Sequence, residues 1–164
     1  MRFGRVAMSR PKRLAGFSYV GLHRYLLTFR TLNSARMFER TDIVGDALSQ
    51  IRLTATLDRF AILAYCFMPD HLHLLVDAMN DEANLRMFVK MAKQRSGASH
   101  ALRGLGRIWQ EGFWDDILRI DDDPLPAIRY IFENPVRARL VSSPREYPYL
   151  GSDVWPVEYL LERL

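Results

Sequence analysis

The two histidines His71 and His73, one residue apart, are the side chains in this sequence best suited to chemistry. They lie in Met68-Pro69-Asp70-His71-Leu72-His73-Leu74-Leu75-Val76, a segment rich in strand-forming residues. Successive side chains of a strand point to opposite faces, so the two imidazoles share one face, with Cα atoms about 6.5 Å apart. Two imidazoles at this spacing can bind one metal ion. The pair therefore predicts a metal site on a sheet face.

Tyr130 and Asn134 form the second chemically interesting pair. Asp121-Asp122-Asp123-Pro124 is typical of a helix start, and Pro135 predicts a helix end near Asn134. Spaced four residues apart, Tyr130 and Asn134 share a side of this helix that the apolar stripe does not occupy. Asn134 is the best candidate for a third, carbonyl-oxygen metal ligand, and Tyr130 could attack phosphorus to form a phosphotyrosine.

Simpler interpretations remain open for both pairs. A tyrosine on a helix and two histidines on a strand can be purely structural, and a phenol with a pKa near 10 is a weak nucleophile. The metal and nearby arginines would have to favour the phenolate. A structural zinc site is another alternative, but it needs a fourth protein ligand. Cys66 is the nearest candidate, and the hairpin register is expected to set it away from the histidines.

The elements that position these residues alternate between strands and helices, which predicts an α/β (α+β) fold. Apolar periodicity and turn signals predict strands at 25–29, 61–67, 71–76 and 117–120, and helices at 41–57, 80–100 and 121–133. The short turn Met68-Pro69-Asp70 predicts an antiparallel hairpin that ends in the histidine strand.

Composition excludes several classes of protein. The 164 residues predict one domain with a proper core, and 49% hydrophobic residues are ordinary for a globular protein. No apolar run approaches the roughly 18 residues of a membrane span, and the basic N-terminus lacks an apolar signal core. The single cysteine, Cys66, excludes an internal disulfide and fits a reducing cytoplasm. We expect it to be a buried apolar side chain; a catalytic thiol is the alternative.

The net charge of +4 permits a nucleic-acid partner without requiring one. Residues 1–15 are expected to form a flexible basic arm that either contacts phosphates or only aids solubility. Trp109 and Trp114 are expected to pack in the core or at a hinge, with base stacking as the alternative. The basic residues expected to contact DNA are Arg10, Lys12, Arg13, Lys90, Lys93, Arg137 and Arg139.

Two segments resemble the signatures of a known family. Met68 to Val76 resembles the HUH motif (His, hydrophobic, His) of the IS200-like transposases. The second segment resembles the signature of their REP-associated tyrosine transposase branch; it is Arg129-Tyr130-Ile131-Phe132-Glu133-Asn134-Pro135-Val136-Arg137-Ala138-Arg139-Leu140-Val141. Leu63-Ala64-Tyr65, Trp109-Gln110-Glu111-Gly112 and Pro144 to Ser152 also fit. The resemblance covers about residues 16–153, with residues 154–164 as a C-terminal extension.

The resemblance implies a metal-dependent single-strand DNA endonuclease and strand transferase. It makes His71 and His73 ligands of Mg²⁺ or Mn²⁺ and Tyr130 the nucleophile that forms a 5′-phosphotyrosine, and Asn134 matches the third-ligand position. It also implies a ferredoxin-like sandwich, with the motif on a central strand of an antiparallel sheet and helices packed on one face. The implied substrates are hairpin-forming repeats bound as single strands. Members of this branch are typically monomers, whereas the insertion-sequence branch forms dimers, so a dimer stays open.

Two positions depart from the family pattern. Asp70 stands where many members have Asn, and Arg139 where Gly is commoner. The first could alter hydrogen bonding at the histidine turn, and the second adds charge or stiffens the turn after the nucleophile helix. A domesticated nucleic-acid-binding protein of the same fold, without cleavage activity, is the alternative function.

Overall fold

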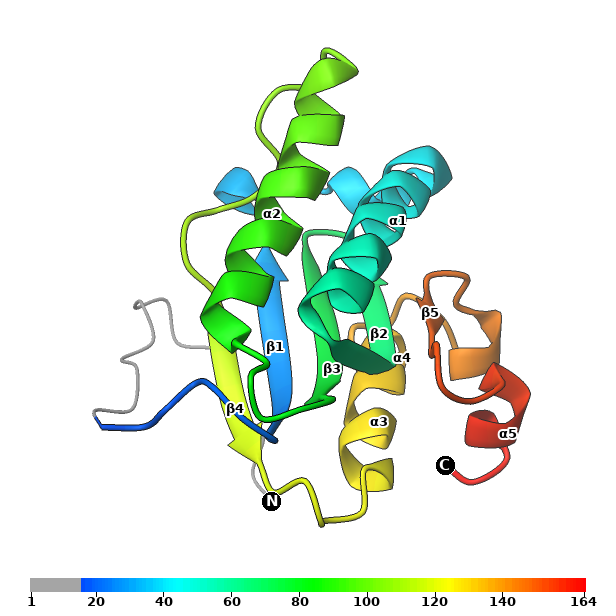
Figure 1. Cartoon of the computed structure of the whole chain (residues 1–164). Helices are drawn as coiled ribbons and strands as arrows, with labels where there is room; N and C mark the ends of the chain where they lie inside the picture. The colour runs from blue at the N-terminus through cyan, green and yellow to red at the C-terminus, as the bar shows by residue number, and fades with distance from the viewer. Residues whose placement is uncertain (1–15) are drawn as a thin grey trace.

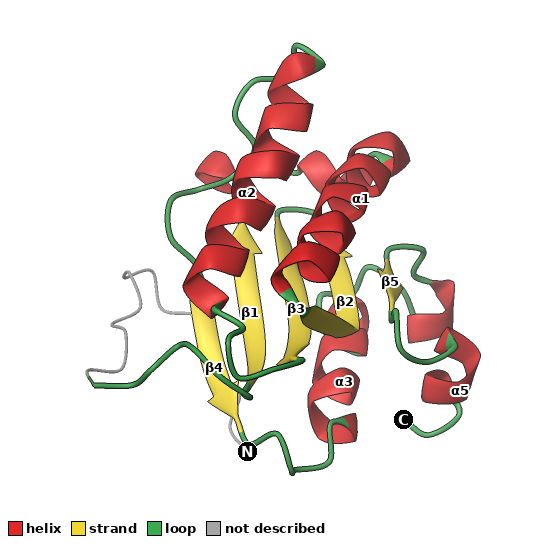
Figure 2. Cartoon of the chain, in the orientation of Figure 1, coloured by secondary structure: helices red, strands yellow, loops and turns green. Residues whose placement is uncertain are grey.

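The computed structural model describes residues 16–164, so the predicted arm and its candidate DNA contacts Arg10, Lys12 and Arg13 lie outside the described residues. The longer elements follow in the order β1 (Arg24–Arg30), α1 (Thr41–Asp58), β2 (Phe60–Met68), β3 (His71–Ala78), α2 (Leu85–Leu102), β4 (Trp114–Leu118) and α3 (Leu125–Phe132). The short elements are η1 (Leu32–Ser34), η2 (Met37–Glu39), α4 (Asn134–Arg137), η3 (Pro144–Glu146), β5 (Leu150–Gly151) and α5 (Val157–Leu161). Figure 1 shows this arrangement, and Figure 2 separates helices from strands.

The strands form one antiparallel sheet in the order β4-β1-β3-β2-β5, which puts the histidine strand β3 at its centre. β1 lies beside β3, with Thr28 opposite His73 and Arg30 opposite His71. β2 and β3 form the expected hairpin, closed by the two residues between Met68 and His71. The order β1-α1-β2-β3-α2-β4 is the β-α-β-β-α-β arrangement. The α+β expectation and the central position of β3 are confirmed.

Helices cover both faces of the sheet, which differs from the expected packing on one face. α1 and α2 lie together against the face that carries Leu72, Leu74 and Val76. The opposite face, with Leu26, Cys66 and Leu75, packs against α3 and the C-terminal segment. The α1 and α2 face of β3 is apolar throughout, whereas on the α3 face Leu75 is the only apolar residue of this strand and lies between the histidines and Asp77. The histidines share the face of α3.

Two strand boundaries depart from the simple pattern. β2 contains a bulge at Leu63, between Ile62 and Ala64, so Leu63 and Ala64 face the same apolar cluster. This bulge accounts in part for the poor alternation in this strand. β4 begins and ends earlier than the predicted strand 117–120, because its pairing with β1 starts at Trp114 opposite Thr28.

The C-terminal segment is part of the second apolar cluster. Leu150 of β5 and Leu160 of α5 are buried with Ile128 and Phe132 of α3. The Tyr147 hydroxyl donates to the carbonyl of Phe67 at 2.7 Å, which ties this segment to β2. Residues 154–164 therefore pack on α3 as an integral part of the fold. Over residues 16–164, none of the helices combines the length and the apolar composition that crossing a membrane requires.

Candidate active site

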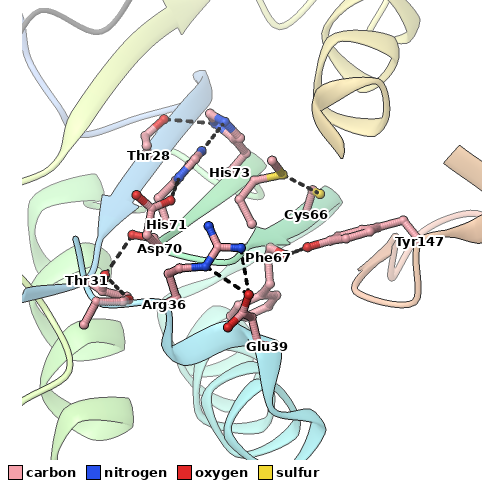
Figure 3. A network of polar contacts seen from close by, with 12 residues as sticks. Thr28, Thr31, Arg36, Glu39, Cys66, Phe67, Asp70, His71, His73 and Tyr147 are labelled. Carbon is pink, nitrogen blue, oxygen red and sulfur yellow. Dashed lines mark hydrogen bonds and ion pairs between the residues drawn. The ribbon is translucent and has the colours of Figure 1, made fainter. Parts of the chain in front are cut away.

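The hairpin turn brings His71 and His73 to the edge of the apolar cluster on the α3 face. Backbone groups outside the hairpin hold the turn residues Pro69 and Asp70 in place. The Pro69 carbonyl accepts a hydrogen bond from the N–H group of Phe38, and the Asp70 carbonyl accepts one from Thr31, at 3.0 Å each. β3 begins directly at His71, so both imidazoles point to the same side. Their Nε2 atoms are 3.1 Å apart (Figure 3).

The outer nitrogen of each imidazole has an oxygen partner. His71 Nδ1 is 2.7 Å from Asp70 Oδ1, and His73 Nδ1 is 3.1 Å from Thr28 Oγ1. Figure 3 shows the resulting chain from Asp70 through the two imidazoles to Thr28. The hydrogen bond to His71 lowers the pKa of the Asp70 carboxyl. Partners of this kind orient the ring and leave Nε2 free to coordinate.

The imidazole pair fits a divalent cation. Two ligand atoms about 2.1 Å from one ion, at about a right angle, are about 3.0 Å apart, close to the observed separation of 3.1 Å. His73 is 4% exposed. Burial, together with smaller effects of nearby cationic groups, lowers its pKa to about 3, so the imidazole is neutral at physiological pH.

Tyr130 of α3 lies directly beside this pair. Its ring centroid is 5.8 Å from that of His73, and the Arg137 guanidinium lies 4.6 Å from the Tyr130 ring centroid. Burial raises the pKa of the Tyr130 phenol; Arg137 opposes this rise and Asp116 adds to it. The phenol is therefore protonated at neutral pH in the folded chain, and the arginine alone does not produce a phenolate.

Asn134 lies just past the end of α3, as the first residue of α4. Its amide nitrogen donates to the carbonyls of Tyr130 at 2.9 Å and Ile131 at 3.3 Å. Both of these hydrogen bonds use the nitrogen, so they leave the Oδ1 atom available as a ligand. The same bonds hold the end of α3 together where the short helix α4 begins, with Pro135 in its first turn.

Residues 19–131 match the sequence model of the protein family "Transposase IS200 like". This match extends over more than half of the chain and includes both histidines and the tyrosine. The chain belongs to the IS200-like transposase family.

Two curated relatives carry more specific names. A protein of Haemophilus influenzae named "Putative REP-associated tyrosine transposase" is 29% identical over 121 residues, which cover 66% of this chain and 68% of that protein. The REP-associated tyrosine transposase of Escherichia coli is 28% identical over 90 residues, 55% of this chain and 53% of that protein. The expected resemblance to this branch is confirmed by these relatives.

A solved structure has the same fold. It is a REP-associated tyrosine transposase bound to a REP hairpin, with a TM-score of 0.70 and 21% identity, covering 87% of this chain and 82% of that chain. At this identity the match establishes that the two proteins share a fold, and no more.

One expectation about Cys66 is wrong. In this IS200-like transposase Cys66 lies directly opposite His73 in the hairpin register, and not away from the pair. Its thiol is fully buried, and burial raises its pKa, so it stays protonated beside the apolar side chains of its cluster. Within residues 16–164, no three side chains from among His, Cys, Asp and Glu gather closely enough to hold a metal ion. A structural zinc site therefore lacks its protein ligands in this part of the chain.

The basic residues predicted to contact DNA fall into different regions. Arg137 lies over Tyr130, while Arg139 follows α4 in the left-handed region with φ of 58°. That conformation favours glycine, which accounts for the glycine commoner at this position in the family. Lys90 is exposed on α2. The Lys93 ammonium donates to the carbonyls of the loop at 110–112 and packs over Phe29, on the face of the sheet opposite the histidines.

The two tryptophans have different surroundings. Trp109 is 4% exposed and donates to Ser96 Oγ at 2.8 Å, so its expected core role is confirmed. Trp114 is only partly buried and lies under the Arg30 guanidinium, 5.3 Å from its ring centroid.

Three residues near the site lie outside the sequence motifs from which the site was predicted. Thr28 and Arg30 belong to β1, and Asp116 belongs to β4, on the sheet face that carries His73. Their positions in the site depend on the strand register. Alternation within 24–30 could have placed Thr28 and Arg30 on one face, but it could not have paired that face with β3.

Proposed function

We propose that this protein is a metal-dependent single-stranded DNA endonuclease and strand transferase that acts on hairpin-forming repeats. The observation that carries the proposal is the convergence of the two Nε2 atoms, 3.1 Å apart, beside the ring of Tyr130. The ferredoxin-like sandwich supplies the frame, since the central strand and the helix on one of its faces bring the three side chains together. The relative solved with a REP hairpin supports the choice of substrate class.

The cofactor in this proposal is Mg²⁺ or Mn²⁺, held by His71, His73 and Asn134. When bound, the cation polarises the scissile phosphate and offsets the charge that develops on it. Asp70 and Thr28 orient the two imidazoles from behind. The neutral state of His73, favoured by burial, suits it to this role without a competing proton.

Tyr130 is the nucleophile. A bond forms between its phenol oxygen and phosphorus while the bond from phosphorus to the 3′ oxygen breaks. The products are a 5′-phosphotyrosine and a free 3′-hydroxyl. The phenol gives up one proton and the departing 3′ oxygen takes up one, so the step is balanced. Because burial raises the pKa of Tyr130, the phenol must lose its proton as it attacks, and Arg137 over the ring stabilises the developing negative charge.

The test is a cleavage assay on a hairpin oligonucleotide taken from the DNA that flanks the coding sequence. The label is placed on the 3′ side of the cleavage point, because a 5′-phosphotyrosine keeps that fragment on the protein. With Mn²⁺ present, the native protein should form a covalent adduct that resists denaturation. Tyr130→Phe should form none, while its hairpin affinity stays within about threefold of the native value, because only one hydroxyl is removed.

The exposed Tyr159→Phe variant provides the matched control and should form the adduct at the native rate. An adduct in the Tyr130→Phe protein would show that another residue is the nucleophile. Tight binding by the native protein, with no cleavage in Mg²⁺ or Mn²⁺, would indicate a domesticated DNA-binding protein.

A further inference from the structure

Arg30, the last residue of β1, has a buried donor without a partner. Its Nε atom is inaccessible to solvent and forms no hydrogen bond. A buried N–H without an acceptor is unfavourable, and native proteins rarely keep one without a reason. The residue lies opposite His71 in the β1–β3 register, so the unpartnered donor belongs to the same sheet face as the imidazole pair.

Arg24, at the other end of β1, shows what such an arginine does when an anion is present. Six residues before Arg30, it lies on the same face and opposite Asp77 of β3. Its Nε donates to Asp77 Oδ1 at 2.6 Å and its Nη2 to Oδ2 at 2.8 Å, a bidentate pair along one edge of the guanidinium. Arg30 has the corresponding position, but the residue across from it is a histidine. The Nε edge of Arg30 therefore lacks the anion that Arg24 has.

The surroundings of Arg30 hold its guanidinium in place, with Nε buried and the two Nη atoms accessible and without a hydrogen-bond partner in the described part of the chain. The indole ring of Trp114 lies 5.3 Å from the guanidinium carbon and limits rotation of its plane. Asp70 is close enough for Arg30 to lower its pKa, but its side chain is bonded to His71. Within residues 16–164, no carboxylate forms an ion pair with Arg30.

We propose that Arg30 binds the scissile phosphate itself, with its two accessible Nη atoms on the non-bridging oxygens. This inference rests on the proposed function, since the phosphate must lie between the imidazoles and Tyr130. A planar guanidinium matches two oxygens of one phosphate, which a lysine ammonium cannot do. Arg30 then holds the phosphate from the β1 side while Arg137 approaches Tyr130 from the α4 side. Trp114 is the positioning residue that sets the plane of the guanidinium.

The experiment compares Arg30→Gln and Arg30→Lys with the native protein in single-turnover adduct formation on the flanking hairpin oligonucleotide. Both variants should form adduct about 10²–10³-fold more slowly, because one preorganised donor pair on the reacting group is lost. Arg30→Lys should be as slow as Arg30→Gln, because a lysine keeps the charge but not the planar edge. Arg163→Gln is the matched control, another arginine stacked on an aromatic ring, and should react at the native rate.

A structural role for Arg30 predicts different results. If the arginine only stacked on Trp114 to support the fold, Arg30→Gln would lower the melting temperature. A phosphate-binding role predicts a melting temperature within about 3 °C of the native value or above it, since an unsatisfied buried donor is removed. Native cleavage rates in both Arg30 variants would overturn the inference and leave the proposed function intact.

A second readout separates the inference from cleavage activity. An oligonucleotide with one neutral methylphosphonate at the expected cleavage point lacks the charged oxygen that Arg30 would bind. The native protein should bind the normal oligonucleotide about tenfold more tightly than this analogue, and Arg30→Gln should bind the two equally. If the native protein cleaves no hairpin, the proposed function fails, and this preference alone decides the role of Arg30. Equal binding of the two oligonucleotides by the native protein would overturn the inference that Arg30 binds the phosphate.

Discussion

The hydrogen bond from Thr28 to His73 offers a direct test of how the imidazole pair is held. Thr28→Val replaces the hydroxyl with a methyl group of similar size and leaves His73 Nδ1 without its partner at 3.1 Å. Thr28 is 7% exposed and His73 is 4% exposed, so water cannot take the place of the hydroxyl. We expect the folded state to lose about 1–3 kcal/mol, the usual cost of an unsatisfied buried polar group.

The larger consequence concerns the cation. When both Nε2 atoms face one ion, each Nδ1 must carry the ring proton and needs an acceptor. Removing such an acceptor typically weakens metal binding 10- to 100-fold, which corresponds to about 1.4–2.8 kcal/mol. Titration of the purified protein with Mn²⁺, followed by the electron paramagnetic resonance signal of the free ion, measures this change directly.

Thr28→Ser is the matched control for this measurement. It keeps the hydroxyl and loses one buried methyl group, so we expect a stability loss of about 1 kcal/mol with Mn²⁺ affinity unchanged. The two variants thus separate packing from hydrogen bonding. Mn²⁺ affinity within twofold of the native value in a folded Thr28→Val protein would refute the idea that Thr28 orients the ligand.

Three further predictions follow from single positions. A Cβ on Gly151 would lie 2.4 Å from the Tyr65 hydroxyl, so Gly151→Ala should destabilise the protein by about 1–3 kcal/mol in urea unfolding. Gly45→Ala, in open space within α1, should instead stabilise the protein by about 0.5–1 kcal/mol. Equal changes in stability for the two variants would contradict the predicted clash at Gly151. Burial lowers the pKa of Lys93 to about 8, below the unfolded value near 10.4, so the folded chain releases this proton first and stability should rise between about pH 8 and 10. Lys93→Met should flatten that rise, and an unchanged slope would show that Lys93 stays charged. Asp70→Asn keeps an oxygen acceptor for His71 and should retain Mn²⁺ affinity within about threefold, whereas Asp70→Ala should lose about tenfold in the same titration; equal losses would show that the acceptor does not matter.

Local patterns in the sequence predicted the parts of the fold that depend on local physics. The helix over 41–57 and the hairpin around Pro69 follow from apolar spacing and a two-residue turn, and both are close to their observed bounds. The alternation of side chains along a strand was enough to predict that His71 and His73 lie on the same sheet face. These features depend on residues within one or two elements, so neighbouring side chains suffice to determine them.

Features that depend on pairing between distant strands were harder to predict. The bulge at Leu63, which shifts the hairpin register between Ile62 and Ala64 and turns Leu63 and Ala64 toward the same apolar cluster, is marked by no local pattern. The placement of Arg30 beside the site needs β1 to pair with β3, across more than 40 residues. Helices on both faces of the sheet follow from a second apolar cluster, to which β2 contributes four residues and β3 only Leu75, and a simple count of apolar residues does not assign that cluster to a particular helix.

The packing of the C-terminal segment on α3 bears on when the protein becomes active during its synthesis. Tyr130 is held by a helix whose apolar side rests on Leu150 and Leu160, residues that leave the ribosome after it. The nascent chain can complete its hairpin and its imidazole pair early, but α3 lacks its outer support until these leucines emerge. We expect nicking activity to begin only after this segment has been made. A chain that stops before Leu150 would then carry every side chain of the proposed site and should still fail to cut DNA.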